Sequence, residues 1–203
     1  MGGGEPLGPL VVPGTYTVTV IAAGTRATAP VVVRADPRLP FDTAAALAQL
    51  RAGLSLRDDV ASTTRMLNGL HSLRTQVANL EQTVRAASLN GTSPDTSALP
   101  AARALDDKVK ALMDTVYDPR VQRNAPEDDI HYLQRFYDQL QGLGFALFFS
   151  YDEAPNAITQ RRMAALHEEL QGYLARYQAL LHTDVPAFNT LAGQHGMGGV
   201  IAR

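Results

Sequence analysis

The N-terminal part of the chain alternates apolar and polar side chains with a period of two, as β-strands do. In "PGTYTVTV", residues 13–20, two sets fall on opposite faces: Tyr16, Val18 and Val20 on one, Thr15, Thr17 and Thr19 on the other. The segment "AAGT", residues 22–25, predicts a turn, because Gly24 adopts positive φ at no steric cost. The return strand carries Val31, Val32 and Val33. Its Pro30 has no N–H to donate, which predicts an edge position or the start of that strand.

We therefore expect a β-hairpin over residues 13–38, after a Gly- and Pro-rich loop over residues 1–12. Two strands alone are marginal in water. The hairpin is thus predicted either to pack Tyr16, Val18 and Val31 on the helices or to leave them partly exposed.

From Asp42 or Thr43, either of which is a good N-cap, one long helix is predicted to reach about Ser88. Its apolar stripe advances in steps of four and three, with one irregular step in the middle: Leu56, Val60, Thr63, Leu67, Leu70, then Leu73, Val77, Leu80 and Val84. The stripe is heptad-like, and the helix would be roughly 65–70 Å long. Gly53 and Gly69 are the two weak points at which it could break or kink.

Three further helices follow, separated by polar linkers near 89–101 and 118–126. The second helix carries Leu105, Val109, Leu112 and Val116, and the third, with Pro126 at its first position, carries Ile130, Leu133, Phe136, Leu140 and Leu147. Pro155 opens the fourth, whose stripe is Ile158, Met163, Leu166, Leu170, Tyr173, Tyr177 and Leu181, continuing past a kink at Pro186. The predicted fold is mainly α, an antiparallel four-helix bundle over residues 39–203 with a long first helix, preceded by an orphan β-hairpin.

Composition narrows the possible functions. A formal charge of -2 and a pI near 6.2, with no block of like charge, argue against a nucleic-acid-binding surface. Cys is absent, which excludes disulfides and thiolate metal sites. The longest apolar run, "LQGLGFALFFSY" (140–151), is too short to span a bilayer. The N-terminus "MGGGEPLGPL" lacks the features of a signal peptide.

No motif in the sequence assembles a catalytic, cofactor or metal site. "HEEL", residues 167–170, has Gln171 where a zinc-protease helix needs its second His, so it is interpreted as a solvated face. "EDDIH", residues 127–131, offers oxygen ligands for a cation, but acidic residues at a helix N-terminus favour the helix dipole in any case. The histidines His71, His167, His182 and His195 suit no ligand set.

The stretch "QGLGFALFF", residues 141–149, follows no strand and lacks a third glycine, so a dinucleotide loop is not expected. Its aromatic residues are interpreted as core. If a groove exists between the helices, Phe145, Phe148 and Tyr151 are the candidates for lining it.

A family resemblance accompanies these patterns. A Gly-rich loop, "VVPGTYTVTVIAAGTRATAPVVVRADPR" (11–38) and a helical tail resemble the C-terminal end of large bacterial β-propeller proteins with BNR (sialidase-type) repeats, described as sortilin-like or glycosyl-hydrolase-like. "LLHTDVPAFNTLAGQHGMGGV" (180–200) resembles the last helix of that family, with Asp184, Pro186 and Asn189 in matching places. The resemblance spans residues 10–201.

The resemblance implies that residues 13–38 are the closing strands of an immunoglobulin-like module, followed by a helical region. No propeller repeat is present, so no functional residue carries over. We expect a non-catalytic structural or protein-interaction module, a fragment of a larger propeller protein. The alternative is part of an exported glycosidase whose active site lies in the propeller. The partners expected are the propeller and immunoglobulin-like portion, or a second copy bound through the long helix; localisation stays open, although such proteins are commonly exported.

Overall fold

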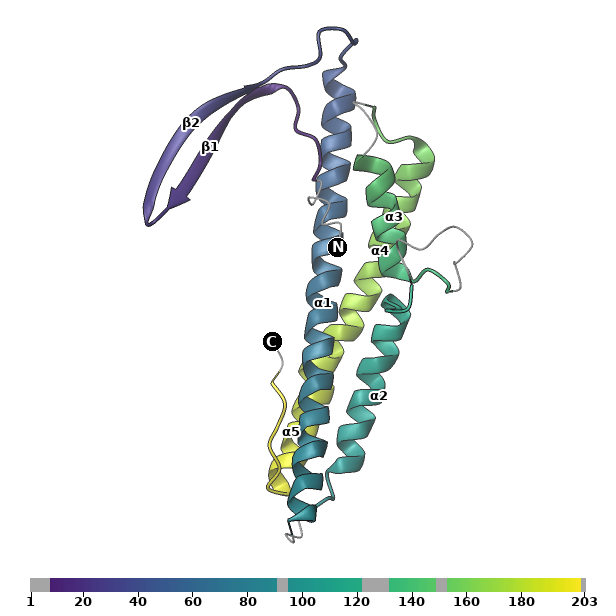
Figure 1. The fold of residues 1–203 in the computed structure, drawn as a ribbon. Coiled ribbons are helices and arrows are strands. Elements are labelled where there is room, and N and C mark those ends of the chain that lie inside the picture. Colours follow the sequence, from purple (N-terminus) through teal and green to yellow (C-terminus); the bar gives the residue numbers. More distant parts are fainter. Residues whose placement is uncertain (1–7, 91–94, 122–131, 149–152, 202–203) are drawn as a thin grey trace. The chain divides into compact units, whose positions relative to one another are not determined.

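The computed structural model describes residues 8–90, 95–121, 132–148 and 153–201. In chain order it contains strands β1 (Gly14–Ala22) and β2 (Thr25–Val33), helices α1 (Thr43–Leu89), α2 (Leu99–Val116), α3 (Phe136–Phe148) and α4 (Ala157–Ala179), the π-helical turn η2 (Leu180–Asp184) and helix α5 (Val185–Gln194) (Figure 1). The last three elements follow one another without a break and form the fourth helix. The predicted fold class, mainly helical with a long first helix after a two-stranded hairpin, is confirmed.

The chain divides into two compact units. Unit 1 comprises residues 1–58 and 142–163, and therefore the hairpin and the start of α1. Unit 2 comprises residues 59–141 and 164–203. Helices α1, α3 and α4 each contribute residues to both units.

Helix α1 begins where the sequence predicts. The Asp42 carboxylate accepts hydrogen bonds from the N–H groups of Ala44 (2.8 Å) and Ala45 (3.3 Å), which satisfies two of the unpaired donors of the first turn. The helix then continues for 47 residues, through both Gly53 and Gly69. Neither glycine breaks it.

The core of unit 2 is built around the α1 stripe, which keeps a regular heptad spacing. Its buried members within this unit are Asp59, Thr63, Met66, Leu70, Leu73, Val77 and Val84, with Leu80 half-buried between the last two. The predicted positions Val60 and Leu67 are half-buried instead. Val60 and Leu67 are in the predicted stripe because they are more apolar than Asp59 or lie next to Met66, and this requires one irregular step. In the structure, alternating steps of three and four residues run from Leu70 back through Met66 and Thr63 to Asp59.

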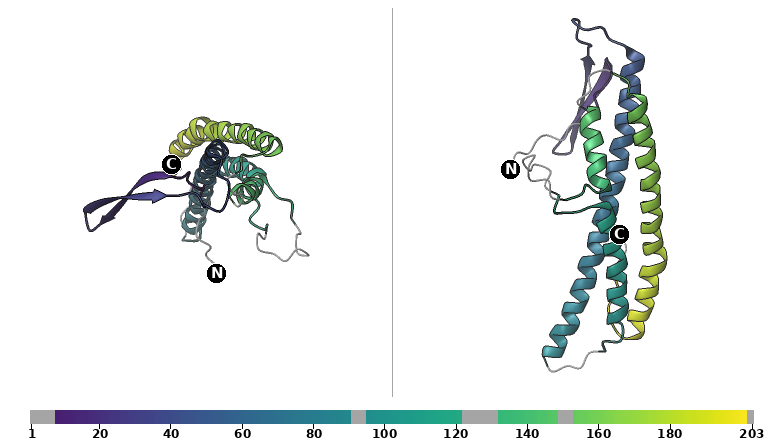
Figure 2. Two further views of the ribbon diagram at one scale, coloured as in Figure 1. Left: turned by 90° about the horizontal axis from the view of Figure 1, so that it is seen from above. Right: turned by 90° about the vertical axis from the view of Figure 1, so that its right-hand side faces the viewer.

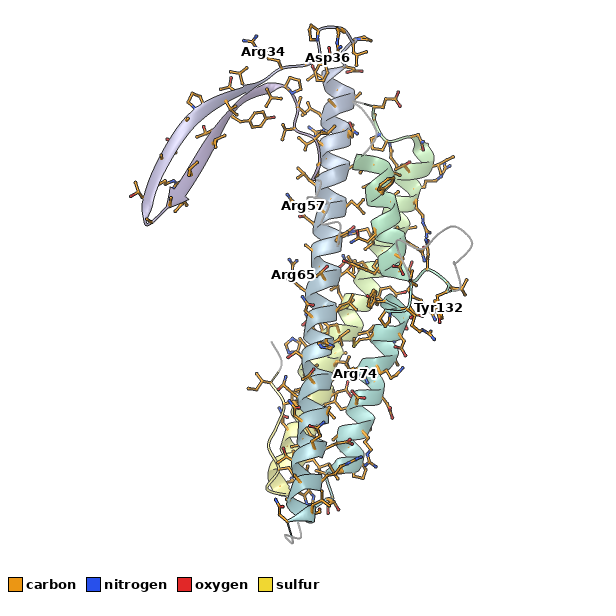
Figure 3. All side chains as sticks on the ribbon, in the orientation of Figure 1. Arg34, Asp36, Arg57, Arg65, Arg74 and Tyr132 are labelled. Carbon is orange, nitrogen blue, oxygen red and sulfur yellow. The ribbon has the colours of Figure 1, made fainter. Side chains whose placement is uncertain are left out.

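Helix α2 packs its predicted face into the same core. Leu105, Val109, Leu112 and Val116 are buried as expected, together with Ala102. The guanidinium of Arg74 on α1 pairs with both carboxylate oxygens of Asp106 on α2, at 2.8 and 3.2 Å. Arg74 lies between the two helices, whereas Arg65 projects away from α2 (Figure 3). In Figure 1 and in the right-hand view of Figure 2, the unit 2 parts of α1, α2 and the fourth helix run side by side.

Helix α3 begins later than the sequence predicts. Pro126 lies outside the described residues, and Leu133, expected in the helical stripe, is non-helical and 82% exposed. The helix starts at Phe136 because Asp138 accepts a hydrogen bond from the Arg135 N–H at 3.1 Å, the reach-back half of a capping box. Phe136 is then buried in edge contact with the Tyr173 ring, with 5.1 Å between the centroids.

The fourth helix is continuous but widens before Pro186. Its start is capped by Asn156, whose oxygen accepts the N–H groups of Ile158 and Thr159, both at 2.9 Å. In η2 the Val185 N–H bonds the Leu180 carbonyl, a step of five residues instead of four. Pro186 follows at the first turn of α5. A proline ring clashes with the carbonyl four residues earlier, and the π-helical turn relieves that clash without ending the helix.

The predicted stripe of the fourth helix is correct in its second half only. Leu166, Leu170, Tyr177, Val185 and Phe188 are buried, but Leu180 is buried in place of the predicted Leu181, which is half-buried. Ile158, which was expected in the stripe, is 71% exposed. It belongs to unit 1, where few side chains form a core: Val12, Ala46, Leu56 and Leu147 are its buried apolar residues among those described.

Candidate functional site

The hairpin has a regular register and a tight turn. β1 and β2 pair antiparallel from Ala22 opposite Thr25 at the turn to Gly14 opposite Val33 at the open end. The two turn residues, Ala23 and Gly24, have φ of 48° and 77°. Two consecutive positive φ values are typical of a type I′ turn, the two-residue loop whose twist matches the strands. The prediction of positive φ at Gly24 is confirmed, and Ala23 is an uncommon residue in that region.

The register divides the hairpin into two chemically different faces. One face, which we call the apolar face, carries Tyr16, Val18, Val20, Ala27, Ala29 and Val31. Half of the residues on the opposite face carry hydroxyl groups, and the other half do not: Thr15, Thr17, Thr19 and Thr28, with Ile21, Arg26, Pro30 and Val32. The only charged residue in the two strands is Arg26, at the turn end.

No residue of either strand is buried, and the apolar face is open. Val18 is 47% exposed and Val20 is 59% exposed. Of the two predicted outcomes for the hairpin, exposure is the one found. Tyr16 turns back on its own chain, with its hydroxyl donating a 2.5 Å hydrogen bond to the Val12 carbonyl.

Exposed large hydrophobic side chains concentrate in unit 1. Among the described residues this unit exposes Leu10, Val11, Tyr16, Val18, Val20, Ile21, Val31, Val32, Leu39, Leu47, Phe145 and Ile158. Unit 2 exposes Leu89, Tyr132, Leu133 and Ile201. Contiguous apolar surface on a folded chain marks an interaction site more often than scattered exposure does. The apolar face of the hairpin is therefore the candidate functional surface.

Comparison with known protein families, curated proteins and solved structures finds no match to this chain. The propeller resemblance of residues 10–201 thus has no support beyond the sequence patterns themselves.

The candidates that the sequence offered for a chemical site stay apart. Glu168 and Glu169 of "HEEL" are exposed, in line with a solvated face. The side chain of His167, however, which is itself exposed, lies 2.9 Å from the carboxylate of Asp59, a buried residue of the α1 stripe. The two residues are 108 positions apart, so sequence spacing gave no signal of this pair. It explains how an acidic residue occupies a core position in the α1 stripe.

His71 is exposed on α1, and His182 and His195 make separate contacts. His195 Nδ1 lies 2.7 Å from Asp95, and His182 lies 3.0 Å from the Gln178 side chain. Hydrogen bonds from Ser97, and then from His195, lower the pKa of Asp95 to about 2. Within the described ranges no three potential ligands cluster as a metal site would require. The "EDDIH" candidate, residues 127–131, lies outside the described residues.

The proposed groove at 141–149 is not supported. Phe145 is 67% exposed, contrary to its interpretation as core, and nothing is described for the side chains of Phe148 and Tyr151. In the part of the chain that the structure describes, no helix is long and apolar enough to cross a membrane.

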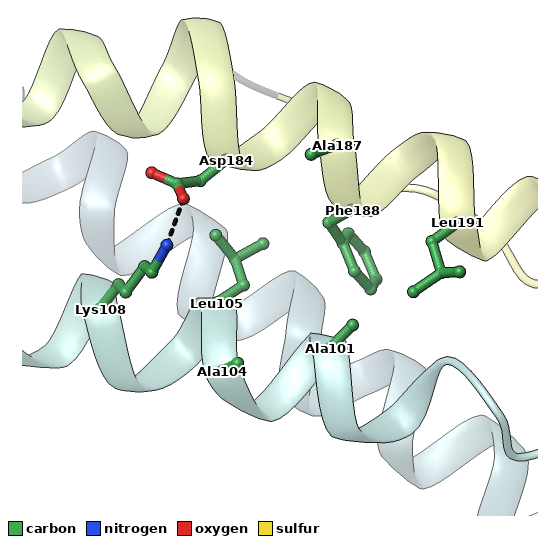
Figure 4. Close-up of a pocket in the computed structure, with 8 residues that line it drawn as sticks. All are labelled: Ala101, Ala104, Leu105, Lys108, Asp184, Ala187, Phe188 and Leu191. Atoms are coloured by element: carbon green, nitrogen blue, oxygen red, sulfur yellow. Dashed lines mark hydrogen bonds and ion pairs between the residues drawn. The ribbon is translucent and has the colours of Figure 1, made fainter.

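A small pocket lies between α2 and α5 in unit 2. It has a volume of about 230 Å³ and is lined by Ala101, Ala104, Leu105, Lys108, Asp184, Ala187, Phe188 and Leu191 (Figure 4). Lys108 and Asp184 form an ion pair at its edge, 2.5 Å apart. Ligand pockets are usually about 300–1,000 Å³ and enclose convergent polar groups. This one is smaller, and its two charged groups neutralise each other.

The chain after α5 is held by two side-chain amides. Asn189 donates to the Val200 carbonyl and accepts from the Val200 N–H, both at 2.8 Å. Gln76 on α1 does the same for Ile201, at 3.1 and 2.8 Å. Each amide imitates one residue of a β-ladder, and Val200 is buried as a result. These hydrogen bonds attach the segment after α5 to the helices of unit 2, so we interpret Asn189 and Gln76 as structural residues.

Proposed function

We propose that this chain is a non-catalytic protein-interaction module, in which the hairpin joins the β-sheet of a partner and the helices supply a stable base. The observation that supports it is the open apolar face of Tyr16, Val18, Val20 and Val31, on a hairpin in which no strand residue is buried. The hydroxyl-rich opposite face is suited to water. A strand pair with one apolar and one polar face is typical of one sheet of a β-sandwich.

The size of the surface agrees with this role. Nine residues per strand extend for about 30 Å, and two strands cover about 10 Å, so the apolar face measures roughly 300 Å². Covering it is worth about 7 kcal/mol at 25 cal/mol per Å². Association itself costs on the order of 4–15 kcal/mol, so the face alone is marginal and the strand edges have to contribute as well.

The propeller-protein origin remains part of this proposal. If residues 13–38 are closing strands of an immunoglobulin-like module, the partner sheet is the rest of that module. None of the described side chains favours the alternative function, that of an exported glycosidase.

Site-specific photo-cross-linking tests the proposal. A photoreactive phenylalanine analogue replaces Val18 on the apolar face, in cells that produce the chain. Matched controls carry it at Thr28, on the opposite face and on strand β2, and at Glu168, on the exposed surface of α4. We expect a protein with a β-sheet domain to be cross-linked at Val18 and at neither control.

Equal cross-linking at Val18 and Glu168 would refute the interaction role. Hydrogen exchange on the isolated chain provides a second check. The hairpin amides should exchange much faster than those of Leu70 and Leu112, because no second layer protects the strands. Equally slow exchange would mean that the hairpin is stable by itself and needs no partner.

A further inference from the structure

The two edges of the hairpin differ in their capacity to accept a further strand. In an antiparallel pair, residues alternate between those that bond each other and those whose N–H and C=O groups point outward. A two-residue type I′ turn makes its flanking pair, Ala22 and Thr25, a bonded one. Counting back from it, Thr17 opposite Pro30 is a non-bonded pair.

The outward groups can therefore be assigned. On β1 they belong to Thr15, Thr17, Thr19 and Ile21, and on β2 to Arg26, Thr28, Pro30 and Val32. Pro30 has no N–H, so the β2 edge lacks a donor in the middle of the strand. The β1 edge carries an uninterrupted series of donors and acceptors, all on exposed residues.

Proline on an edge strand, together with a charged side chain, is a recurrent way to prevent further pairing. β2 has both, Pro30 and Arg26. On β1 no proline and no charged residue interrupts the run from Gly14 to Ala22. One edge is thus blocked and the other open.

We infer that the partner contributes an extended strand to the free edge of β1, while β2 remains the outer edge of the completed sheet. This inference rests on the proposed function and adds to it the edge and the kind of occupant. The partner strand alternates, with apolar side chains continuing the face of Tyr16, Val18 and Val20. Its sheet belongs to a domain whose second layer covers that face.

Area favours such a partner over a second copy of the hairpin. Two copies stacked by their apolar faces bury only about 300 Å² each and leave both β1 edges open. Two copies paired by their β1 edges leave the apolar faces exposed and continuous. A stable complex needs about 800 Å² per partner, which requires the edge and the face to be covered together.

Disulfide exchange with a synthetic strand measures the preference between edges. The chain contains no Cys, so Thr17→Cys and Thr28→Cys each introduce a unique thiol, one on each edge and both on the hydroxyl-rich face. The probe is a nine-residue peptide of alternating valine and threonine with Cys replacing the central threonine. After equilibration in glutathione buffer, mass spectrometry gives the fraction of each chain that carries the peptide.

We expect the Thr17→Cys chain to carry at least about fivefold more peptide, the effect of one missing strand hydrogen bond of about 1 kcal/mol. Adding Pro30→Thr to the Thr28→Cys chain should raise its adduct, because the missing donor is restored while the non-bonded pair leaves the internal ladder intact. Equal adducts at both edges, or more peptide on the Thr28→Cys chain, would overturn the inference.

The disulfide experiment uses a synthetic peptide, so its outcome does not depend on finding the natural partner. Selective adducts at Thr17→Cys with no cross-link at Val18 would refute the proposed function and leave the edge assignment standing. A cross-link at Val18 combined with non-selective adducts would do the reverse.

Discussion

The clamp between Asn189 and the terminal segment offers a sharp test of how unit 2 is closed. Asn189→Ala removes two hydrogen bonds of 2.8 Å to Val200 and leaves the N–H and carbonyl of that buried residue unpaired. At about 1 kcal/mol for each bond, plus about 1–2 kcal/mol if Val200 then leaves the core, the free energy of unfolding should fall by about 2–4 kcal/mol. Urea denaturation followed by circular dichroism measures it.

The matched control is Thr190→Ala, the next residue of α5. Its hydroxyl is exposed and bonds only the Pro186 carbonyl of the same helix, so its loss should change the free energy of unfolding by no more than about 0.5 kcal/mol. In the Asn189→Ala chain the Val200 amide should also lose its protection from hydrogen exchange. If the two variants are equally stable, or if the Val200 amide exchanges as in the parent chain, the clamp does not hold the segment.

A double-mutant cycle separates the clamp from general damage. A Cβ on Gly199 would lie 2.7 Å from the Asn189 Oδ1 atom, so Gly199→Ala displaces the amide and should cost nearly as much as Asn189→Ala. In the Asn189→Ala background that clash no longer exists, and Gly199→Ala should then cost little. Additive effects of the two substitutions would contradict direct contact as the cause.

Three further predictions follow from the described geometry. Ala23→Gly removes the cost of positive φ in the hairpin turn, about 1 kcal/mol, and should slow hydrogen exchange at the strand amides without changing unit 2. Burial, and then the hydrogen bond to Glu169, raises the pKa of Tyr173 to about 12. The folded state therefore favours the neutral phenol, so this stabilisation is complete below pH 10 and is lost as the pH rises from 10 to about 12. Ultraviolet titration and alkaline unfolding should both show it, and Tyr173→Phe should remove it. Leu70→Ala should cost about 2–5 kcal/mol and Leu133→Ala at most about 0.5 kcal/mol in urea denaturation, since the first is fully buried and the second is 82% exposed.

The elements themselves could be predicted because their signals are local. The alternation of residues 13–20, the Gly24 turn and the Asp42 cap each act within a few residues, and each is found. The residues that α1 buries could not all be predicted from such local signals. Asp59 is acidic, and the His167 side chain that contacts its carboxylate lies 108 positions further along the chain, so the sequence gives no sign that Asp59 is buried.

The candidate surface, too, could be predicted from the sequence only in part. The two faces of the hairpin are visible in the sequence, but the contrast between its edges is not. From sequence alone Pro30 indicates either an edge position or the start of the strand, and the register then shows that it lies within β2, opposite Thr17, with its missing donor on the outer edge. The start of α3 is another case, because Asp138 caps Arg135 and leaves Leu133 outside the helix. The helical spacing of apolar residues continues on both sides of such a cap, so the spacing alone does not show where the helix begins.

The distribution of buried surface bears on whether α1 or the hairpin is better suited to bind a partner. A second copy bound through the long helix would need the heptad stripe, yet Leu70, Leu73 and Val77 are already buried in unit 2. Exposing each of them costs about 1.5–3 kcal/mol, so a helix-mediated dimer of that kind has to replace a core that already exists. The apolar face of the hairpin carries no such cost, because Val18 and Val20 are exposed before any partner arrives. Association through the strands adds buried area, whereas association through the α1 stripe only exchanges it, and the hairpin is for that reason the surface on which a partner is expected.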